Sequence, residues 1–362
     1  MSTHTAIAAI AKGKFDAIQV ETPKPGAGQI LLKVAYASMI AFDTYITDLG
    51  YSVTEYPITF GLNASGTVVE VGEGSSLAVG DRIIAFSPHV FARQELQGTM
   101  QEFIALPDHL CAKIPDNFAL DAAATIPDNF ATAFFTLFDQ LSLPIPSSFP
   151  ATIPPPNRET AILVYGAGST TGQYTLQLLH AAGYTNLVAT ASPKHHALLR
   201  ALGATHVFDY ATPTLAADIA AAIGGDGKIA FAVDSISADG TIAKIAQVLR
   251  PGGAAAFLLP IKVGDTVAVG DAGMRASISE EQLNLFSKDT KIAYVRTLTY
   301  RQNEHLKNNL MPKILPQLLA SGIIQPNRVR LLEQGTFKER VATGLDLLRN
   351  NKVSGEKIIV KV

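Results

Sequence analysis

The chain has 362 residues, of which 48% are hydrophobic and 17% charged, and its formal net charge at pH 7 is −2. Its length is roughly that of two domains, and the balanced charge without like-charge blocks argues against a nucleic-acid-binding surface or a polybasic membrane surface. The single cysteine, Cys111, excludes an intramolecular disulfide and a cysteine zinc cluster, and is typical of a reducing compartment.

The start of the chain predicts no targeting signal. Residues 1–15 lack a basic start, and their apolar run is too short for a signal peptide. The apolar stretch 254–263 is about half a membrane span and contains Pro260. We therefore expect a soluble cytoplasmic protein with neither a membrane nor a nucleic-acid partner. The sequence leaves open whether it is a monomer or a homodimer.

Strand patterns dominate the first third of the chain. Residues 5–36 predict two or three strands, and residues 61–86 predict more strands separated by glycine turns. The segments 100–106 and 110–114 predict the last strands of a small irregular barrel. Helical spacing then begins in residues 120–141, which marks a domain boundary.

A proline-rich segment follows at residues 143–158 and predicts a surface loop or semi-rigid spacer. From residue 160 onwards, strand and helix patterns alternate, which predicts a parallel sheet with right-handed crossovers. The expected strands are 161–165, 186–191, 206–210, 228–237, 254–261 and 289–300. Pro251-Gly252-Gly253 is expected to end the helix before the fifth strand.

The chain ends in a helix pattern at 306–322 and a helix, turn and strand at 337–362. No crossover helix follows the last strand, so we expect it to return to the first domain. The prediction is an α/β fold with a β domain formed by residues 1–130 and 305–362. Residues 131–304 form the parallel-sheet domain, including the loop 143–158.

The turn after the first parallel strand has the composition of a phosphate-binding site. Backbone N–H groups at a helix N-terminus, together with the helix dipole, attract phosphate, and hydroxyl side chains add donors. A second strand about 20 residues later completes a mononucleotide-binding unit. The candidate cofactor residues in this turn are Gly166, Gly168, Ser169, Thr170, Thr171 and Gly172.

The end of the second strand indicates which cofactor binds. An NAD site usually has an Asp or Glu there, against the ribose 2′-hydroxyl, but residues 160–208 contain no acidic residue. Ser192 and Lys194 stand at this place instead and can bind a 2′-phosphate. The sequence therefore predicts NADPH. For the neighbouring His195 and His196 we favour a solvated helix start.

Several motifs, in their order, resemble those of the medium-chain dehydrogenase/reductase family: PGAGQILLKV, GLNASGTVVEVGEG with VGDRI, AAATIPDNFATAFF, LVYGAGSTTG, LGATHVFDY and VSGEKIIVKV. The resemblance covers nearly the whole chain. It implies a doubly wound Rossmann sheet and a GroES-like β-barrel domain formed from both chain ends. The proline-rich insertion, TASP and VFDY are most similar to fungal trans-acting enoyl reductases and toxin-cluster reductases, whereas DTYI resembles the quinone oxidoreductase branch.

One departure from this family concerns zinc. The positions of the catalytic zinc ligands correspond to Ile40, to Leu62 with Asn63, and approximately to Asp128. Isoleucine and leucine offer no N, O or S donor, so we expect no metal. Hydride addition to a conjugated C=C bond does not need that metal, because hydrogen-bond donors can hold the enolate.

The resemblance also suggests catalytic candidates. Tyr45 corresponds to a tyrosine beside the nicotinamide, although it is equally explained as a core aromatic residue. Thr132 corresponds to a threonine near the carboxamide, and it also fits a helix N-terminus. Asp128 and Asn129 fall where substrate is expected, and they equally suit a helix N-cap. Asp43 more simply holds its own loop through backbone hydrogen bonds.

Three further residues are cofactor candidates. Tyr210 corresponds to a position that faces the 2′-phosphate or adenine in the family. Leu259, at the end of the fifth strand, is expected to give backbone contacts, and Ile236 lies near the end of the fourth expected strand. We expect the nicotinamide to lie in a cleft at the carboxyl ends of the parallel strands.

The expected reaction is NADPH-dependent, zinc-independent reduction by an ene or enoyl reductase. Hydride passes to the β-carbon of an α,β-unsaturated carbonyl or thioester, which is either a free small molecule or an acyl chain on a carrier. Two alternatives stay open: an NADPH quinone oxidoreductase and a non-catalytic NADPH-sensing protein.

Overall fold

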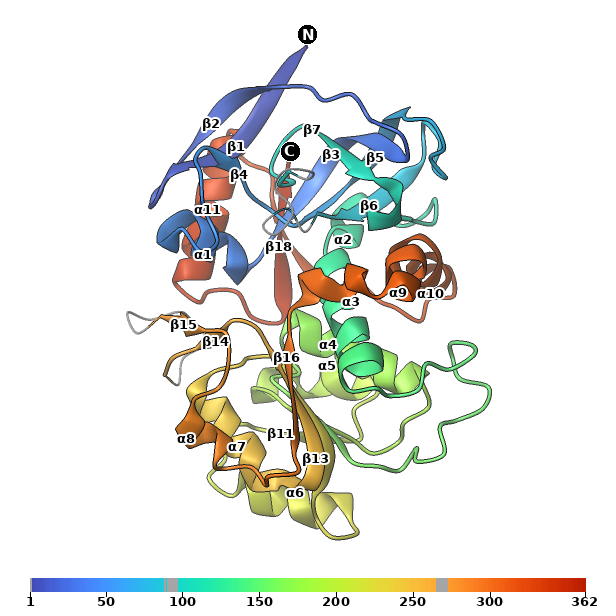
Figure 1. Ribbon diagram of the computed structural model, residues 1–362, viewed down its shortest axis with the longest axis vertical. Coiled ribbons are helices and arrows are strands. Elements are labelled where there is room, and N and C mark those ends of the chain that lie inside the picture. Colours follow the sequence, from blue (N-terminus) through green and yellow to red (C-terminus); the bar gives the residue numbers. More distant parts are fainter. Residues whose placement is uncertain (1, 88, 90–96, 265–272) are drawn as a thin grey trace. The chain divides into compact units, whose positions relative to one another are not determined.

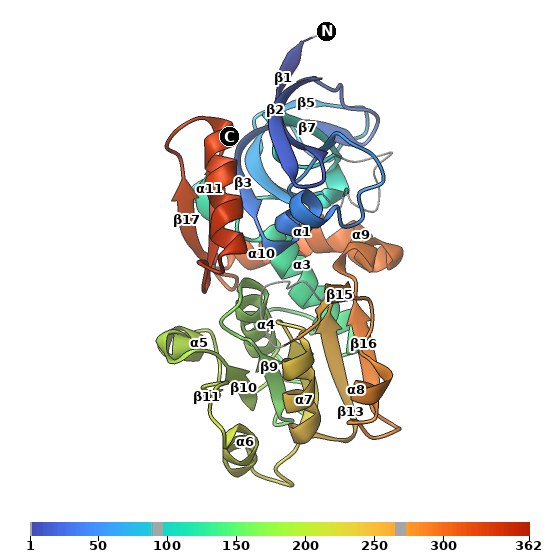
Figure 2. The same cartoon turned by 90° about the vertical axis from the view of Figure 1, so that its left-hand side faces the viewer.

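The computed structural model describes residues 2–87, 89, 97–264 and 273–362. It divides into two compact units, which are coloured along the chain in Figures 1 and 2. Unit 1 comprises Met1–Asp128 and Leu298–Val362, and unit 2 comprises Asn129–Thr297. No helix in the described ranges is long and apolar enough to cross a membrane.

Unit 1 contains two β-sheets. The smaller sheet has the order β2 (Lys14–Glu21), β1 (Thr3–Ala11) and β4 (Ile58–Thr59). The larger has seven strands in the order β17 (Arg328–Leu332), β18 (Glu356–Lys361), β3 (Gln29–Met39), β5 (Asn63–Val71), β6 (Arg82–Phe86) and β8 (Cys111–Lys113), with β7 (Phe103–Pro107) paired to β3. The last strand, β18, therefore returns to the first domain and pairs antiparallel with β3, as predicted (Figure 1).

Short helices and turns complete unit 1: α1 (Ala41–Leu49), η2 (Asp108–Leu110), α2 (Leu120–Ala123), α9 (Glu304–Asn309), the π-helical η6 (Leu310–Ile314), α10 (Leu315–Ala320) and α11 (Phe337–Arg349). The single helix expected over 306–322 is therefore three segments. Pro312 lies inside η6 and lacks the N–H that a continuous α-helix would use, which accounts for the interruption. The 3-10 segment η5 (Thr297–Gln302) begins at the last residue of unit 2.

Unit 2 is built on a six-stranded parallel sheet, as predicted (Figure 2). The order is β11 (His206–Phe208), β10 (Leu187–Thr190), β9 (Ile162–Tyr165), β12 (Ile229–Asp234), β13 (Leu249–Leu258) and β16 (Lys291–Val295). All four residues of β9 are buried, which explains its uninterrupted apolar sequence. The segment 143–158 contains neither strand nor helix.

The helices of unit 2 are α3 (Pro127–Phe135), η3 (Thr136–Gln140), α4 (Thr170–Ala181), η4 (Pro193–His195), α5 (His196–Ala201), α6 (Leu215–Ile223), α7 (Asp239–Val248) and α8 (Glu280–Leu283). A short hairpin pairs β14 (Ile261–Lys262) with β15 (Met274–Arg275). Contrary to expectation, Pro251-Gly252-Gly253 does not end α7 but lies within β13. Arg250 precedes a proline, which disfavours helical backbone, so the chain becomes extended from Leu249.

Apolar side chains of α6 and α7 pack on one face of this sheet. Leu215 and Ile219 of α6, and Ile242 and Ile245 of α7, join one buried cluster with Leu163 and other residues of β9, β12 and β13. Burial of such side chains contributes about 1.5 to 3 kcal/mol each. The cluster fixes the sheet, and with it the turns at the carboxyl ends of its strands.

Candidate functional site

The turn between β9 and α4 has the geometry of an anion-binding turn. The Ser169 side chain caps α4 by accepting a hydrogen bond from the Gly172 N–H at 3.1 Å, and Gly166 adopts a left-handed φ of 72°. The Gly166 N–H is held by the Thr190 hydroxyl at 3.1 Å, and this bond ties the turn to β10. The first turn of α4 begins with Thr170 and Thr171, and the backbone N–H groups of a first helical turn point out of the helix N-terminus.

Close packing accounts for all three glycines of the turn. A Cβ on Gly166 would lie 2.4 Å from Cγ1 of Ile236, and one on Gly172 would lie 2.6 Å from the Ala167 Cα. A Cβ on Gly168 would lie 3.0 Å from Cδ2 of His195. The structure therefore brings two sequence-predicted residues, Gly166 and Ile236, into direct proximity. Because glycine has no side chain, the backbone at these three positions is not covered by side-chain atoms of the turn itself.

The two strand ends expected at the 2′-phosphate are neighbours. β10 and β11 are parallel, and Thr190 is paired with Phe208, so Ser192 and Tyr210 each lie two residues beyond this pair. Lys194 is exposed. Among the described residues, neither the Ser192 nor the Lys194 side chain has a hydrogen-bond or ion-pair partner. Both therefore remain available to an anionic ligand.

Of the two neighbouring histidines, His195 is buried, contrary to expectation, whereas His196 is partly exposed at the start of α5. His195 is 8% exposed and lies against Gly168 of the turn. The Nε2 of His196 lies 3.0 Å from the carbonyl oxygen of Ala191, which follows β10.

Two buried titratable side chains that the sequence analysis missed, Asp234 of β12 and Lys262 of β14, hold the turn after β12. Asp234 is fully buried and accepts hydrogen bonds from the Ile236 and Ser237 N–H groups at 2.9 and 2.8 Å, and from the Thr241 hydroxyl. The Lys262 ammonium donates to the Ile236 carbonyl oxygen. Burial raises the pKa of Asp234 and lowers that of Lys262, outweighing the attraction between them. These hydrogen bonds hold both the N–H and the carbonyl oxygen of Ile236.

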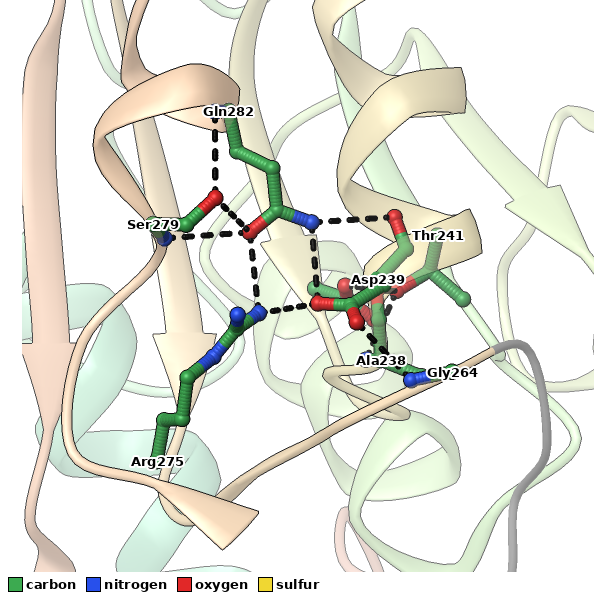
Figure 3. Close-up of polar contacts among 8 residues, drawn as sticks. Ala238, Asp239, Thr241, Gly264, Arg275, Ser279 and Gln282 are labelled. Atoms are coloured by element: carbon green, nitrogen blue, oxygen red, sulfur yellow. Dashed lines mark hydrogen bonds and ion pairs between the residues drawn. The ribbon is translucent and has the colours of Figure 1, made fainter. Parts of the chain in front are cut away.

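A second polar cluster holds the β14–β15 hairpin and α8 on the start of α7 (Figure 3). The Asp239 carboxylate accepts from Arg275, from Gln282 Nε2 at 2.9 Å and from the Gly264 N–H at 2.8 Å. Ser279 caps α8 and also contacts Gln282. An acidic side chain in the first turn of α7 is favourable to the helix dipole, so the same carboxylate stabilises both the helix and the hairpin.

The remaining unit 2 candidates make contacts within that unit. Asn129 and Thr132, on α3, are 7% and 8% exposed. Asn129 Nδ2 donates to Thr171 Oγ1 at 3.0 Å, which joins α3 to the glycine turn. Thr132 Oγ1 lies 2.8 Å from Thr297 Oγ1. The Leu259 N–H donates to the Val295 carbonyl oxygen at 3.1 Å, so this donor is used within the unit.

Unit 1 contains a buried polar cluster around Asp128. Its carboxylate pairs with the Lys357 ammonium at 2.6 Å, and the two side chains are 6% and 1% exposed. The Asp128 N–H donates to Asn63 Oδ1 at 2.8 Å, and Asn63 Nδ2 donates to the Ser38 hydroxyl at 3.0 Å. Lys357 was missed in the sequence because a lysine in a C-terminal strand pattern gives no sign of its partner 229 positions away.

Asp43 belongs to the same region and is fully buried. Its carboxylate accepts from the Ile40 N–H at 2.8 Å and from the Gly61 N–H at 3.2 Å, as its predicted loop-holding role requires. Burial raises its pKa to about 7, and the nearby Asp128 adds to the rise, while these two hydrogen bonds and Lys357 oppose it.

These residues do not form a zinc site. Ile40 and Leu62 have no donor atoms, and the Asp128 carboxylate is paired with an ammonium group. In the part of the chain that the structure describes, no group of three His, Cys, Asp or Glu residues could hold a metal ion. The donor set therefore does not fit a tetrahedral zinc ion.

The Tyr45 side chain is buried in the core, and its hydroxyl can still donate a hydrogen bond. It is 7% exposed and lies edge-on to Phe42, with ring centroids 5.9 Å apart. Burial raises its pKa to about 12, so the phenol keeps its proton at neutral pH. Within the described ranges, its hydroxyl has no hydrogen-bond partner. The core position and the donor role are thus compatible.

Comparisons with known proteins agree with this architecture. Residues 26–116 match the alcohol dehydrogenase GroES-like domain, and residues 170–260 match the zinc-binding dehydrogenase model. The chain is 30% identical to trans-enoyl reductase himH of Aspergillus japonicus, over 92% of this chain and 90% of that protein. It is also 30% identical to trans-enoyl reductase buaC of Petromyces alliaceus, over 99% and 97%.

A solved structure gives the same fold. The crystal structure of CurK enoyl reductase superposes with a TM-score of 0.76 at 19% identity, covering 99% of both chains. At this identity the likeness shows the fold alone, which is a GroES-like domain with a Rossmann-like parallel sheet.

Proposed function

Because the chain belongs to the medium-chain dehydrogenase/reductase family, we propose that it is an NADPH-dependent, zinc-independent ene or enoyl reductase. It would transfer hydride to the β-carbon of an α,β-unsaturated carbonyl compound or thioester. One observation carries this proposal. A chain similar along its length to trans-enoyl reductases has Ile40, Leu62 and an ion-paired Asp128 where zinc dehydrogenases hold their metal.

The proposed cofactor follows from the donors around the glycine turn. The turn at Gly166–Gly172 and the first turn of α4 would hold the pyrophosphate, and Ser192 and Lys194 would hold the 2′-phosphate of NADPH. Tyr210 would lie beside that phosphate, and Ile236 and Leu259 would line the rest of the cofactor. When bound, NADPH supplies the hydride.

The chain's own residues would hold the substrate and stabilise developing charge. We assign to Tyr45 the hydrogen bond to the substrate carbonyl, because its hydroxyl is protonated and has no partner in the described residues. This bond strengthens as the enolate oxygen gains charge. Thr132 and Asn129 would position the nicotinamide end, and Asp128 would keep its segment in place through Lys357. The α-carbon then takes a proton from water or from a nearby donor.

The substrate would be a largely apolar unsaturated carbonyl compound, either free or as an acyl chain on a carrier. We place the reaction in the cytoplasm, since Cys111 is the only cysteine and is buried as a free thiol. The protein would act there as a monomer or a homodimer.

Isotope transfer tests the reaction. The purified protein is supplied with NADPH deuterated at C4 and with a panel of enones, enoyl thioesters and quinones. We expect a saturated product that carries deuterium on its β-carbon. Deuterium at a carbinol carbon, or oxidation of NADPH by quinones but by no enone, would refute the proposed reaction. Binding of NADPH with no turnover across the panel would indicate a sensor.

A further inference from the structure

Lys244, on α7, contacts Tyr210 in two ways. Its ammonium donates a hydrogen bond to the Tyr210 carbonyl oxygen at 2.9 Å and lies 6.0 Å from the centroid of the Tyr210 ring. A cation at that distance from an aromatic ring is attracted to it. One side chain of α7 therefore holds both the backbone and the ring of Tyr210.

The segment that carries Tyr210 is otherwise lightly held. Tyr210 is 43% exposed. A cavity of about 240 Å³ separates residues 211–213 from the apolar side chains of α6 and α7, and Lys244 forms part of its wall. The nearest backbone bonds are local, from Ala211 and Thr212 to Asp209. Lys244 thus ties this segment to a helix that belongs to the rigid core of unit 2.

The Tyr210 backbone that this ammonium binds follows β11 at the carboxyl edge of the sheet, where the proposed phosphate donors also lie. Tyr210 and Ser192 leave neighbouring parallel strands two residues after the pair Thr190 and Phe208. Asp209 adds a negative charge beside Tyr210, and its carboxylate accepts from the Ala211 N–H at 3.0 Å. A lysine that orients Tyr210 also adds a positive charge beside it, which makes the strand ends more favourable to a phosphate dianion.

We propose that Lys244 is a positioning residue that sets the preference for NADPH over NADH. It holds the Tyr210 ring in place and contributes positive charge at the 2′-phosphate. The inference rests on the proposed function only in its choice of cofactor, and it does not depend on the substrate.

Equilibrium binding of NADPH and NADH to the full-length protein, measured by cofactor fluorescence, tests the proposal. In Lys244→Met we expect the dissociation constant for NADPH to rise about 3- to 10-fold, while that for NADH changes less than about 2-fold. Lys244→Arg keeps the charge and should recover most of the preference. Added salt should lower the ratio of the NADH to the NADPH dissociation constant in the wild type. The same salt should lower this ratio less in Lys244→Met.

The matched control is Lys228→Met. The Lys228 ammonium also donates to a backbone carbonyl, that of Gln247 at 3.0 Å, but it precedes β12 and so lies at the amino end of the sheet. We expect this variant to leave both dissociation constants unchanged. If Lys244→Met weakens the binding of NADPH and NADH equally, or weakens neither, the proposed role of Lys244 is overturned while the NADPH assignment stands. A wild-type protein that binds both cofactors equally would refute the NADPH assignment and, with it, this inference.

Discussion

Replacing the buried carboxyl of Asp43 should change how stability depends on pH. Burial raises the pKa of Asp43 to about 7 in the folded protein, from its ordinary value of 3.8. Between these values the folded chain holds a proton that the unfolded chain has released, so the wild type loses stability as pH rises. The loss is at most about 1.4 kcal/mol per pH unit and amounts to about 2.3 kcal/mol between pH 5 and pH 7, because the folded-state carboxyl is already half ionised at pH 7.

Asp43→Asn removes this titration but keeps the shape of the side chain. The amide has one oxygen for the two N–H donors of Ile40 and Gly61, so the variant should be destabilised by a constant amount. The free energy of unfolding of the wild type minus that of Asp43→Asn should therefore fall by about 2.3 kcal/mol from pH 5 to pH 7, by a few tenths more up to pH 8, and level off above.

Denaturant unfolding followed by circular dichroism at pH 5, 6, 7 and 8 measures this difference. Glu70→Gln, which changes an exposed carboxylate of β5, is the control and should show no such trend. The reasoning is refuted if the free energy of unfolding of the wild type minus that of Asp43→Asn stays flat or rises with pH. Such a result would show that the Asp43 carboxyl is ionised throughout this pH range.

Four further outcomes are expected. Lys194→Ala should raise the NADPH dissociation constant roughly 10- to 100-fold through loss of a charge-assisted bond, and unchanged binding in a titration would contradict the assignment. Tyr45→Phe should lower kcat by about 10²- to 10³-fold in steady-state assays if its hydroxyl acts as a full oxyanion donor. Lys357→Met should destabilise the fold by about 3 to 5 kcal/mol by leaving Asp128 buried and unpaired, and Lys357→Met with Asp128→Leu should recover part of this. Elemental analysis should find no stoichiometric zinc, and activity should survive chelation; zinc lost together with activity would contradict this.

The parallel sheet could be predicted because its inner strands, such as β9 and β10, are buried on both faces and read as continuous apolar runs between helices. The return of β18 to the first domain followed from the absence of a crossover helix after it. By contrast, β17 was missed, because its arginines at 328 and 330 mask the strand pattern and it is paired only on one edge.

The glycine turn and the donors after β10 could be predicted because their spacing is local. The ion pair of Asp128 with Lys357 and the hydrogen bonds by which Asp234 and Lys262 hold Ile236 could not, since each joins residues from separate elements that only the folded chain brings together. Helical spacing likewise could not reveal that the region 304–320 changes to a π-helix around Pro312.

The pairing of β18 with β3 also constrains the order in which the protein folds during synthesis. Unit 2 is one continuous segment, Asn129–Thr297, and leaves the ribosome before the C-terminal part of unit 1 exists. β3 cannot pair with β18 until residues 356–361 have been synthesised, after the whole of unit 2. Until then β3 presents an open strand edge, the kind of surface on which chains aggregate. Deletion of residues 356–361 would make that exposure permanent.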